Sequence, residues 1–495
     1  MMPSGRMGRV FADIHHPSVA DLLDALQPGL GHIPGAADIV VRQVCIDSRQ
    51  AGEGSLFVAL KGERADGHDY VGQAFAAGAV AAVVERPVTG CAAVDVARGL
   101  VPEGLSAPVE VVVADALAAL QALARARRAA RPDLLVVGVT GSVGKTTTKE
   151  AVAAVLSAGM ETLRSEGNHN NEIGLPLTLA GLEARHRCAV LEMGMYALGE
   201  IAALCAIARP TIGVVTNVGP THLERLGTIE RIAEAKSELV RALPDHGWAV
   251  LNGDDERVRA MAAATSASVL TFGVGAGNAV RARDIASEGL AGVRFRVEAT
   301  SAARAAGQAP RWDVAVRALG RHAVMAALPA IAIGLVQGLD WEQIQSALLA
   351  QGQGPRLTPR RGRGGITVLD DAYNASPASV IAALDVLQEL SGRRVAVLGD
   401  MLELGAYDEE GHRAVGRRAA AAVDVLVTVG VRAQRIAQGA REEGIDPAAV
   451  RRAYSCDEAL RIVEALLRPG DYVLVKASRS MGLESLVKAL VEDVA

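Results

Sequence analysis

Aromatic residues and cysteines are scarce in this sequence. Aromatic residues make up 3% of the 495 positions although half of the residues are apolar, so alanine, valine and leucine must build the core. The five cysteines are scattered, and none forms a C-x-x-C pair. Their number and spacing argue against a zinc site or a disulfide framework and favour a reducing compartment.

Strong charge and long apolar runs are also lacking. A formal net charge of -5 gives no electrostatic basis for binding nucleic acid. The longest apolar run, residues 323–336, contains Pro329 and is too short to span a bilayer, so we expect a buried helix there. Residues 1–18 lack the apolar core of a secretory signal. We therefore expect a cytoplasmic protein without a nucleic-acid partner or membrane insertion. We also expect a monomer, although nothing in these features bears on the oligomeric state.

The length and the apolar pattern predict the fold class. A chain of this length holds about three domains. Continuous apolar runs, such as LLVVGVT and TIGVVTNVG, are typical of parallel strands covered by helices on both faces. We predict an α/β protein with a small N-terminal α/β domain (1–112), a central P-loop ATPase-like domain with a mostly parallel sheet (113–354) and a C-terminal Rossmann-like domain (355–495). A helix is expected over 114–130.

The stretch GVTGSVGKTTTKE, residues 138–150, has the pattern of a phosphate-binding loop between a strand and a helix. Such a loop surrounds phosphate oxygens with backbone N–H groups, while its lysine adds a charge and its threonine binds Mg²⁺. The strict G-x-x-x-x-G-K-[ST] spacing fails, because Val139 stands where the first glycine would be. The predicted nucleotide-binding residues are Thr140, Gly141, Ser142, Val143, Gly144, Lys145, Thr146 and Thr147.

Other polar residues follow apolar runs. Glu192, at the end of such a run, is a predicted Mg²⁺ ligand. His222, after TNVGP, is either structural or in contact with metal or phosphate. Asn170 and Asn171 either cap turns or line a site, and capping is favoured on the residues alone. Lys236 lies in an amphipathic helix, where helical spacing alone predicts a solvated lysine.

The order of these motifs resembles the Mur ligases. G-x-T-G-x-x-G-K-T-T, N-x-N-N-E-I-G-x-P-L-T, E-M-G-M, N-x-G-P-x-H-L-E and A-K-x-E follow one another as in that family. NNEIGLPLTL, DDAYNASPASV and VLGDMLELG resemble the family member that adds a dipeptide. VKASRSMGLE resembles the family's K-G-S-R-x-M-x-L-E, with Ala477 in place of the glycine. Residues 46–71 are similar to the family's domain for the UDP sugar, so the resemblance runs nearly end to end.

The resemblance implies an activity and leaves two alternatives. The implied enzyme uses ATP to join D-alanyl-D-alanine to a UDP-N-acetylmuramoyl-tripeptide through an acyl phosphate, a step of peptidoglycan synthesis. One alternative is the sister ligase that adds a diamino acid to the UDP-muramoyl-dipeptide; the motif DDAYNASP and the lack of a D-N-P-R-like motif argue against it. The other is a non-catalytic nucleotide-binding homologue.

The resemblance also implies roles for individual residues. Lys145, Lys236 and His222 would be catalytic, with Lys236 carbamylated. Two Mg²⁺ ions would be held by Thr146, Glu192, His222 and Lys236. Arg356 would reach the ATP phosphates and Asp371 the ribose, and substrates would contact Ser48, Arg49, Asn170, Asn171, Tyr373 and Asn374. Ala323 and Ala326 stand where the family has asparagines near the adenine, so we expect looser base recognition, or recognition by other groups.

Overall fold

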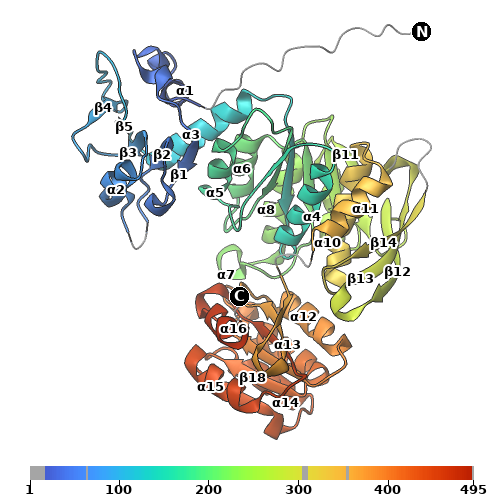
Figure 1. Cartoon of the computed structure of the whole chain (residues 1–495). Helices are drawn as coiled ribbons and strands as arrows, with labels where there is room; N and C mark the ends of the chain where they lie inside the picture. Colours follow the sequence, from blue (N-terminus) through green and yellow to red (C-terminus); the bar gives the residue numbers. More distant parts are fainter. Residues whose placement is uncertain (1–16, 63–64, 304–309, 353–355, 493–495) are drawn as a thin grey trace, which may run out of the picture. The chain divides into compact units, whose positions relative to one another are not determined.

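The computed structural model describes residues 17–62, 65–303, 310–352 and 356–492. In this part of the chain, helices alternate with the strands of a five-stranded, a nine-stranded and a six-stranded sheet (Figure 1). The predicted α/β class with parallel-rich sheets is confirmed. The chain divides into two compact units: one holds the described part of 1–136 together with 161–189 and 203–209, and the other holds the rest of the described residues.

The first sheet is parallel throughout, with the strand order β1-β2-β3-β5-β4. Both of its faces are covered, which explains why its strands are apolar on both sides. Leu56 and Val83 pack with α1 and α3 on one face, and Phe57 and Ala82 pack with α2 on the other. The elements are α1 Val19–Leu26, β1 Gln43–Cys45, β2 Ser55–Val58, α2 Val71–Ala76, β3 Ala81–Val84, β4 Ala92–Asp95, β5 Val109–Val112 and α3 Ala116–Ala129.

The central sheet has the strand order β14-β13-β12-β11-β10-β9-β6-β8-β7. The pairs formed by β6, β9, β10 and β11 are parallel, as predicted. Its strands are β6 Leu135–Thr140, β7 Thr162–Arg164, β8 Cys188–Glu192, β9 Ile212–Val215, β10 Trp248–Asn252, β11 Ser268–Gly273, β12 Val280–Ser287, β13 Val293–Ala299 and β14 Arg311–Val316. The helices of this region are α4 Lys145–Ser157, α5 Gly174–Ala180, α6 Glu200–Ala208, α7 Leu223–Leu226, α8 Ile229–Arg241, α9 Glu256–Ala260, α10 Arg321–Val336 and α11 Trp341–Ala350.

The parallel pattern of this sheet ends at β12, which is still parallel to β11. β13 runs antiparallel to both β12 and β14. In β13, Val293, Phe295 and Val297 are buried, whereas Arg294 and Arg296 between them are exposed. Antiparallel strands with one face in water alternate in this way. The charged residues interrupt the continuous apolar runs by which the parallel strands were recognised, so these strands were not predicted.

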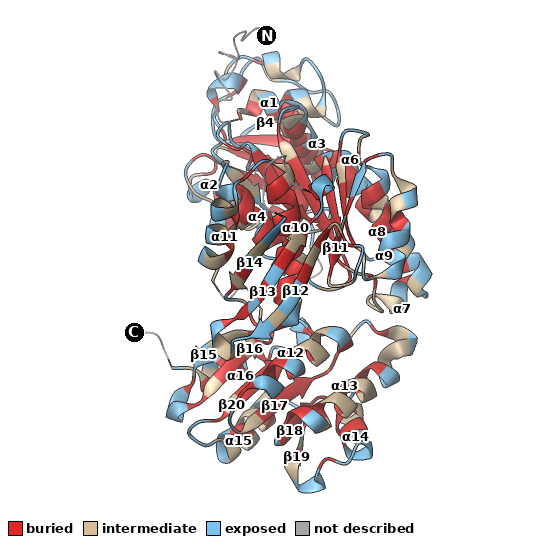
Figure 2. Ribbon diagram, turned by 90° about the vertical axis from the view of Figure 1, so that its right-hand side faces the viewer, coloured by how far each residue is buried: buried red, intermediate tan, exposed pale blue. Residues whose placement is uncertain are grey.

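The third sheet, with the order β15-β16-β20-β17-β18-β19, is parallel except at its edge strand β15. Leu398 and Leu474 pack with α12, α13 and α14, and Val397 and Val475 pack with α15 and α16. Buried strands between two helical layers (Figure 2) form the predicted Rossmann-like arrangement. The elements are β15 Thr358–Arg361, β16 Thr367–Asp371, α12 Pro377–Glu389, β17 Arg394–Gly399, α13 Asp408–Ala422, β18 Val425–Val429, α14 Gln434–Glu442, β19 Val450–Ala453, α15 Cys456–Leu466, β20 Tyr472–Lys476 and α16 Glu484–Leu490.

Two predicted helices are confirmed with small shifts in their bounds. The helix expected over 114–130 is α3, which begins later because the Asp115 carboxylate accepts the Ala118 N–H and caps it. The apolar run 323–336 lies in α10, most of which is buried.

Some expectations stay untested. Residues 1–16, on which the expectation about a secretory signal depends, lie outside the described residues, and so does the predicted boundary at 354/355. The boundary at 112/113 stays a prediction. None of the helices that the structure describes combines the length and the apolarity that a membrane crossing requires.

Candidate active site

The glycine loop follows β6 and leads into α4, as the sequence predicts. Gly141 has φ +153°, and a Cβ there would lie 1.8 Å from Thr216 Oγ1, so a larger residue would displace the loop. Gly144 has φ +85° with open space around its Cβ position. The first turn of α4 carries Thr146 and Thr147, so free N–H groups and hydroxyls meet at the loop.

The segment after β9 braces this loop. β6 and β9 are parallel neighbours, with Thr140 opposite Val215, so both following segments leave the sheet at the same edge. Asn217 Oδ1 accepts from Val143 N over 2.9 Å, and its Nδ2 donates to Val143 O over 2.8 Å. Thr216 Oγ1 donates to the same carbonyl over 2.7 Å. Neither bracing residue was predicted from the sequence; the usable signal was their position directly after a buried strand.

Lys145 is folded back over the loop. Its Nζ donates to Gly141 O over 2.9 Å and to Ser142 O over 3.5 Å. Burial lowers the pKa of Lys145, the charge of Glu192 raises it, and the charge of Arg356 lowers it. Glu192 is 2% exposed at the end of β8. A lysine, a second cation and a buried carboxylate therefore act on one another electrostatically at the loop.

Lys236 lies on α8, which is amphipathic as predicted, but the expectation of a solvated side chain is wrong. Lys236 is 2% exposed and shares the buried helix face with Ile232 and Leu239. Burial first, and then the charge of Lys145, lower the pKa of Lys236 well below its ordinary value. Such surroundings favour the neutral amine over the ammonium ion.

His222 contacts a residue far away in the sequence. Its Nδ1 lies 2.7 Å from Glu403 Oε2. The Tyr196 ring meets the imidazole edge-on, with 5.0 Å between the ring centroids. The contact with His222 lowers the pKa of Glu403. Glu403 belongs to the motif VLGDMLELG, but the sequence analysis gave this residue no role.

The residues present fit Mg²⁺. Among the described residues, no three histidine, cysteine, aspartate or glutamate side chains come together as a metal-binding group. Mg²⁺ does not require such a group, since it keeps several waters and is usually held by one or two carboxylates and substrate phosphates. The Thr146 hydroxyl at the loop and the buried Glu192 carboxylate are ligands of this kind.

Asp371 and Lys476 stand opposite each other at the ends of β16 and β20. Lys476 Nζ lies 2.5 Å from Asp371 Oδ2 and 2.9 Å from the carbonyl of Asn374. Asp371 Oδ1 is buried and accepts no hydrogen bond from any residue that the structure describes. An acceptor of this kind suits a ligand hydroxyl. Lys476 was also missed, although a lysine that ends the apolar run DYVLVK was a usable signal.

Tyr373 lies against two arginines. The guanidinium carbon of Arg356 lies 4.1 Å from the centre of the Tyr373 ring, and that of Arg479 lies 4.8 Å from it. Arg479 Nη1 also donates to Tyr373 Oη over 2.8 Å. Arg356, predicted for the phosphates, and Tyr373, predicted for the dipeptide, are thus in contact.

The other predicted substrate residues lie in the first compact unit. Ser48 is buried, and its hydroxyl donates to Gln73 over 3.1 Å. Arg49 is exposed and pairs with Asp47 over 2.6 Å. Asn171 accepts from the backbone of Gly174 at the start of α5 over 2.9 Å, which is the capping role favoured on the residues alone. Their roles, and that of Asn170, in substrate binding stay predictions.

Ala323 and Ala326 are buried on α10, and their methyl groups have no hydrogen-bonding atoms for a base.

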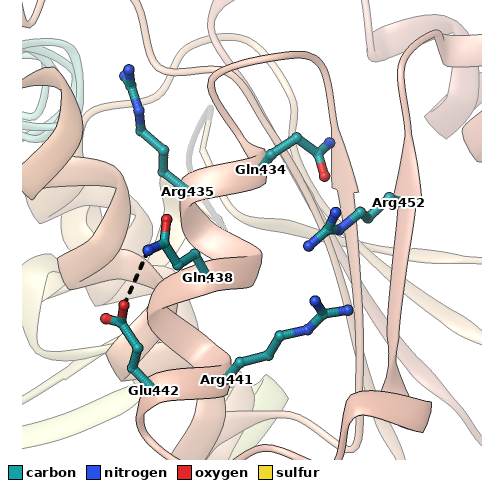
Figure 3. A pocket seen from close by; sticks show the side chains of 6 residues that line it. All are labelled: Gln434, Arg435, Gln438, Arg441, Glu442 and Arg452. Carbon is teal, nitrogen blue, oxygen red and sulfur yellow. Dashed lines mark hydrogen bonds between the residues drawn. The ribbon is translucent and has the colours of Figure 1, made fainter.

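A cavity of about 450 Å³ lies at α14 and β19 and is lined by none of the predicted site residues (Figure 3). It is lined by Gln434, Arg435, Gln438, Arg441, Glu442 and Arg452.

Comparisons with known proteins agree with the predicted resemblance. Family models match in three segments: the Mur ligase family catalytic domain at 40–128, the Mur ligase middle domain at 139–334, and the Mur ligase glutamate ligase domain at 355–479. The UDP-N-acetylmuramoyl-tripeptide–D-alanyl-D-alanine ligase of Mycobacterium tuberculosis is 40% identical, over 92% of this chain and 93% of that protein.

Solved structures give the same result. MurF from Acinetobacter baumannii superimposes with a TM-score of 0.80 at 32% identity, over 96% of this chain and 98% of that one. MurF ligase from Thermotoga maritima, solved in complex with ADP, has a TM-score of 0.74 at 28% identity, over 91% and 97% of the two chains. The chain therefore belongs to the Mur ligase family.

Proposed function

We propose that this chain is the ATP-dependent ligase that joins D-alanyl-D-alanine to UDP-N-acetylmuramoyl-tripeptide and so forms the UDP-muramoyl-pentapeptide of peptidoglycan synthesis. The observation that carries the proposal is the glycine loop, braced by Asn217 and covered by Lys145. The names of the relatives support the choice of dipeptide and tripeptide.

The chemistry explains why such a ligase needs a phosphate loop. A carboxylate is a poor acyl donor, because its leaving group would be oxide. Transfer of the γ-phosphoryl group of ATP to the carboxylate forms an acyl phosphate, which the amine of the dipeptide attacks, and phosphate leaves. Lys145 neutralises the β and γ phosphates, and Mg²⁺ held by Thr146 and Glu192 would supply further positive charge there.

Lys236 is proposed to act as a carbamate. An amine reacts with carbon dioxide only when it is neutral, and burial favours the neutral form of Lys236. The carbamate is an anion, so the nearby charge of Lys145 would attract it instead of opposing it. With His222, the carbamate would face a second Mg²⁺. Loss of activity in buffer freed of carbon dioxide, with recovery on adding bicarbonate, tests this role; full activity without carbon dioxide contradicts it.

The remaining predicted site residues are proposed to bind the nucleotide, the dipeptide and the UDP-muramoyl substrate. Asp371, through its free Oδ1, would accept a ribose hydroxyl, and Arg356 would contact the phosphates. Tyr373 and Asn374 would lie at the dipeptide, Asn170 and Asn171 at the acyl group, and Ser48 and Arg49 at the UDP sugar. We propose that these roles divide among domains at 1–112, 113–354 and 355–495, and that the protein works as a cytoplasmic monomer.

One assay separates this proposal from its alternatives. The protein is incubated with ATP, with each UDP-muramoyl acceptor, and with D-alanyl-D-alanine or diaminopimelate, while phosphate release and the ligated product are measured. We expect product only from the tripeptide and the dipeptide. Product from the UDP-muramoyl-dipeptide and diaminopimelate alone would instead identify the sister ligase, and no product from any pair would identify a non-catalytic homologue.

A further inference from the structure

Two positively charged side chains, those of Arg356 and Arg479, lie beside Tyr373. The nearby Lys476 ammonium is neutralised by Asp371, at 2.5 Å. Arg356 and Arg479, by contrast, form no ion pair with any carboxylate that the structure describes, although both guanidinium groups lie against the Tyr373 ring. Two arginines at one tyrosine, without a carboxylate partner in the described part of the chain, give this place the positive charge that an anion requires.

The fold holds Arg479 at this place. β16 and β20 are parallel neighbours, so the segments that follow them leave the sheet at the same edge, one with Tyr373 and the other with Arg479. Arg479 opens a short helical turn after β20. Its Nη1 donates to Tyr373 Oη over 2.8 Å, which leaves Nε and Nη2 available for a ligand. The tyrosine therefore orients the guanidinium group and leaves most of its donors unused.

The two arginines suit two different anions of the reaction. Arg356 acts electrostatically on Lys145 of the phosphate loop, which associates it with the nucleotide. The incoming dipeptide brings another anion, its terminal carboxylate, which is not consumed. If this carboxylate is held at a fixed point, the amine at the other end of the dipeptide is held at a fixed distance from it. The planar fork of arginine matches a carboxylate in geometry and charge.

We propose that Arg479 binds the terminal carboxylate of the incoming dipeptide and that Tyr373 is the positioning residue for its guanidinium group. This inference rests on the proposed function. The inference requires the incoming dipeptide to carry a free terminal carboxylate. Arg479, which recognises this carboxylate, is not among the site residues predicted from the sequence.

The test compares D-alanyl-D-alanine with D-alanyl-D-alaninamide, which lacks the carboxylate, at saturating ATP and UDP-muramoyl-tripeptide. A hydrogen-bonded charge pair contributes about 1.5–3 kcal/mol, so the wild-type protein is expected to prefer the acid by about 10- to 100-fold in kcat/KM. In Arg479→Ala, KM for the acid rises by a similar factor, KM for ATP stays the same, and the ratio of acid to amide falls to about one. In Tyr373→Phe, KM for the acid rises only a few-fold.

Controls separate recognition from folding. Arg441→Ala removes another arginine without an ion-pair partner in the described part of the chain, at the cavity of Figure 3, and should keep the wild-type preference for the acid. Arg479→Lys is a milder variant, because it keeps the positive charge and loses only the planar fork of donors. Its ratio of acid to amide in kcat/KM should lie between those of the wild type and Arg479→Ala. Thermal unfolding checks each variant.

Three results would overturn the inference. In the first, Arg479→Ala and Arg479→Lys keep the full preference for the acid. In the second, KM for ATP rises in these variants and KM for the dipeptide does not. In the third, the wild-type protein ligates acid and amide equally well, which refutes carboxylate recognition but leaves the proposed function intact. A wild-type protein that ligates neither refutes the proposed function itself.

Discussion

The ammonium group of Lys145 donates a hydrogen bond to the carbonyl of Gly141, four residues earlier, over 2.9 Å. The lysine thus occupies the mouth of its own loop. In the proposed function, a bound nucleotide would replace this neutral acceptor with phosphate oxygens. The ammonium group and a phosphate attract each other as full opposite charges, which a neutral carbonyl does not offer, so the exchange favours the bound nucleotide.

Removal of the Lys145 ammonium group should abolish ligation without unfolding the protein. In Lys145→Ala we expect kcat/KM to fall by at least about 100-fold, because the charge that neutralises the phosphates is lost. The free energy of unfolding should change by no more than about 1 kcal/mol, since the ammonium bonds only loop carbonyls. Phosphate release and denaturant unfolding measure the two effects. Lys488→Ala, an exposed lysine on α16, is the control; a fully active Lys145→Ala would refute the phosphate role.

The two loop glycines should differ in their tolerance of alanine. At Gly141 the new methyl group would lie 1.8 Å from Thr216 Oγ1, whereas at Gly144 it would enter open space. Gly144→Ala should therefore lower the free energy of unfolding only by the backbone strain of a left-handed residue, about 1–2 kcal/mol. Gly141→Ala should cost more and also weaken nucleotide binding.

Thermal unfolding of both variants, together with Gly141→Ala in a Thr216→Ala background, measures this difference. Because Thr216→Ala removes the nearest clashing atom, the double variant should recover part of the lost stability. Equal losses in the two single variants would show that the contact with Thr216 does not limit position 141.

Asn217 should act on nucleotide affinity through Val143. Asn217→Ala leaves the N–H and carbonyl of Val143 without this partner, at a cost of about 2 kcal/mol in the free energy of unfolding. Asn217→Asp keeps the acceptor for the N–H but places a negative charge beside the phosphates. The aspartate also turns an acceptor oxygen toward the Val143 carbonyl to which Nδ2 donates in the wild type. We therefore expect Asn217→Asp to be destabilised as well, and to bind ATP more weakly than Asn217→Ala.

Isothermal titration with ATP at two salt concentrations distinguishes these effects. Screening should reduce the defect of Asn217→Asp at high salt and leave that of Asn217→Ala nearly unchanged. If both variants bind ATP as tightly as the wild type, Asn217 does not position the loop.

His412 should make the stability of the protein depend on pH. Its Nε2 accepts from Met401 N over 3.0 Å, and its Nδ1 lies 2.7 Å from the carbonyl of Asp408, so the neutral ring is fully bonded. Burial lowers the pKa of His412 from 6.5 to about 4; the charge of Asp400 favours the protonated ring and that of Arg432 opposes it. Between about pH 6.5 and pH 4, His412 is protonated in the unfolded chain but stays neutral in the folded chain. Stability is therefore lost as the pH falls from about 6.5 to about 4, by about 3 kcal/mol in all.

The measurement is the free energy of unfolding between pH 7.5 and 4 for the wild type and His412→Gln. The glutamine keeps one donor and one acceptor but does not titrate, so the variant should be less stable at pH 7 and show a shallower decline toward pH 4. Parallel curves for the two proteins would assign the acid sensitivity to other groups.

The sequence alone was sufficient for the fold class, the glycine loop between a strand and a helix, and the family. These depend on short-range patterns: apolar runs that mark strands buried on both faces, glycine spacing after one of them, and the order of motifs along the chain. The strands β12, β13 and β14, which pair antiparallel with one another, were not predicted, because charged residues interrupt their apolar runs.

Only the tertiary structure decided which polar residues meet. The burial of Lys236 depends on which elements cover α8. Helical spacing shows which residues share a face of the helix, but it does not show which residues at the edge of the apolar face become covered. Asn217 against Val143, Lys476 against Asp371 and Glu403 against His222 join residues separated by 74, 105 and 181 positions. Such contacts arise because parallel strands and their connections bring distant segments to one sheet edge or surface, and no local pattern in the chain records which segments these will be.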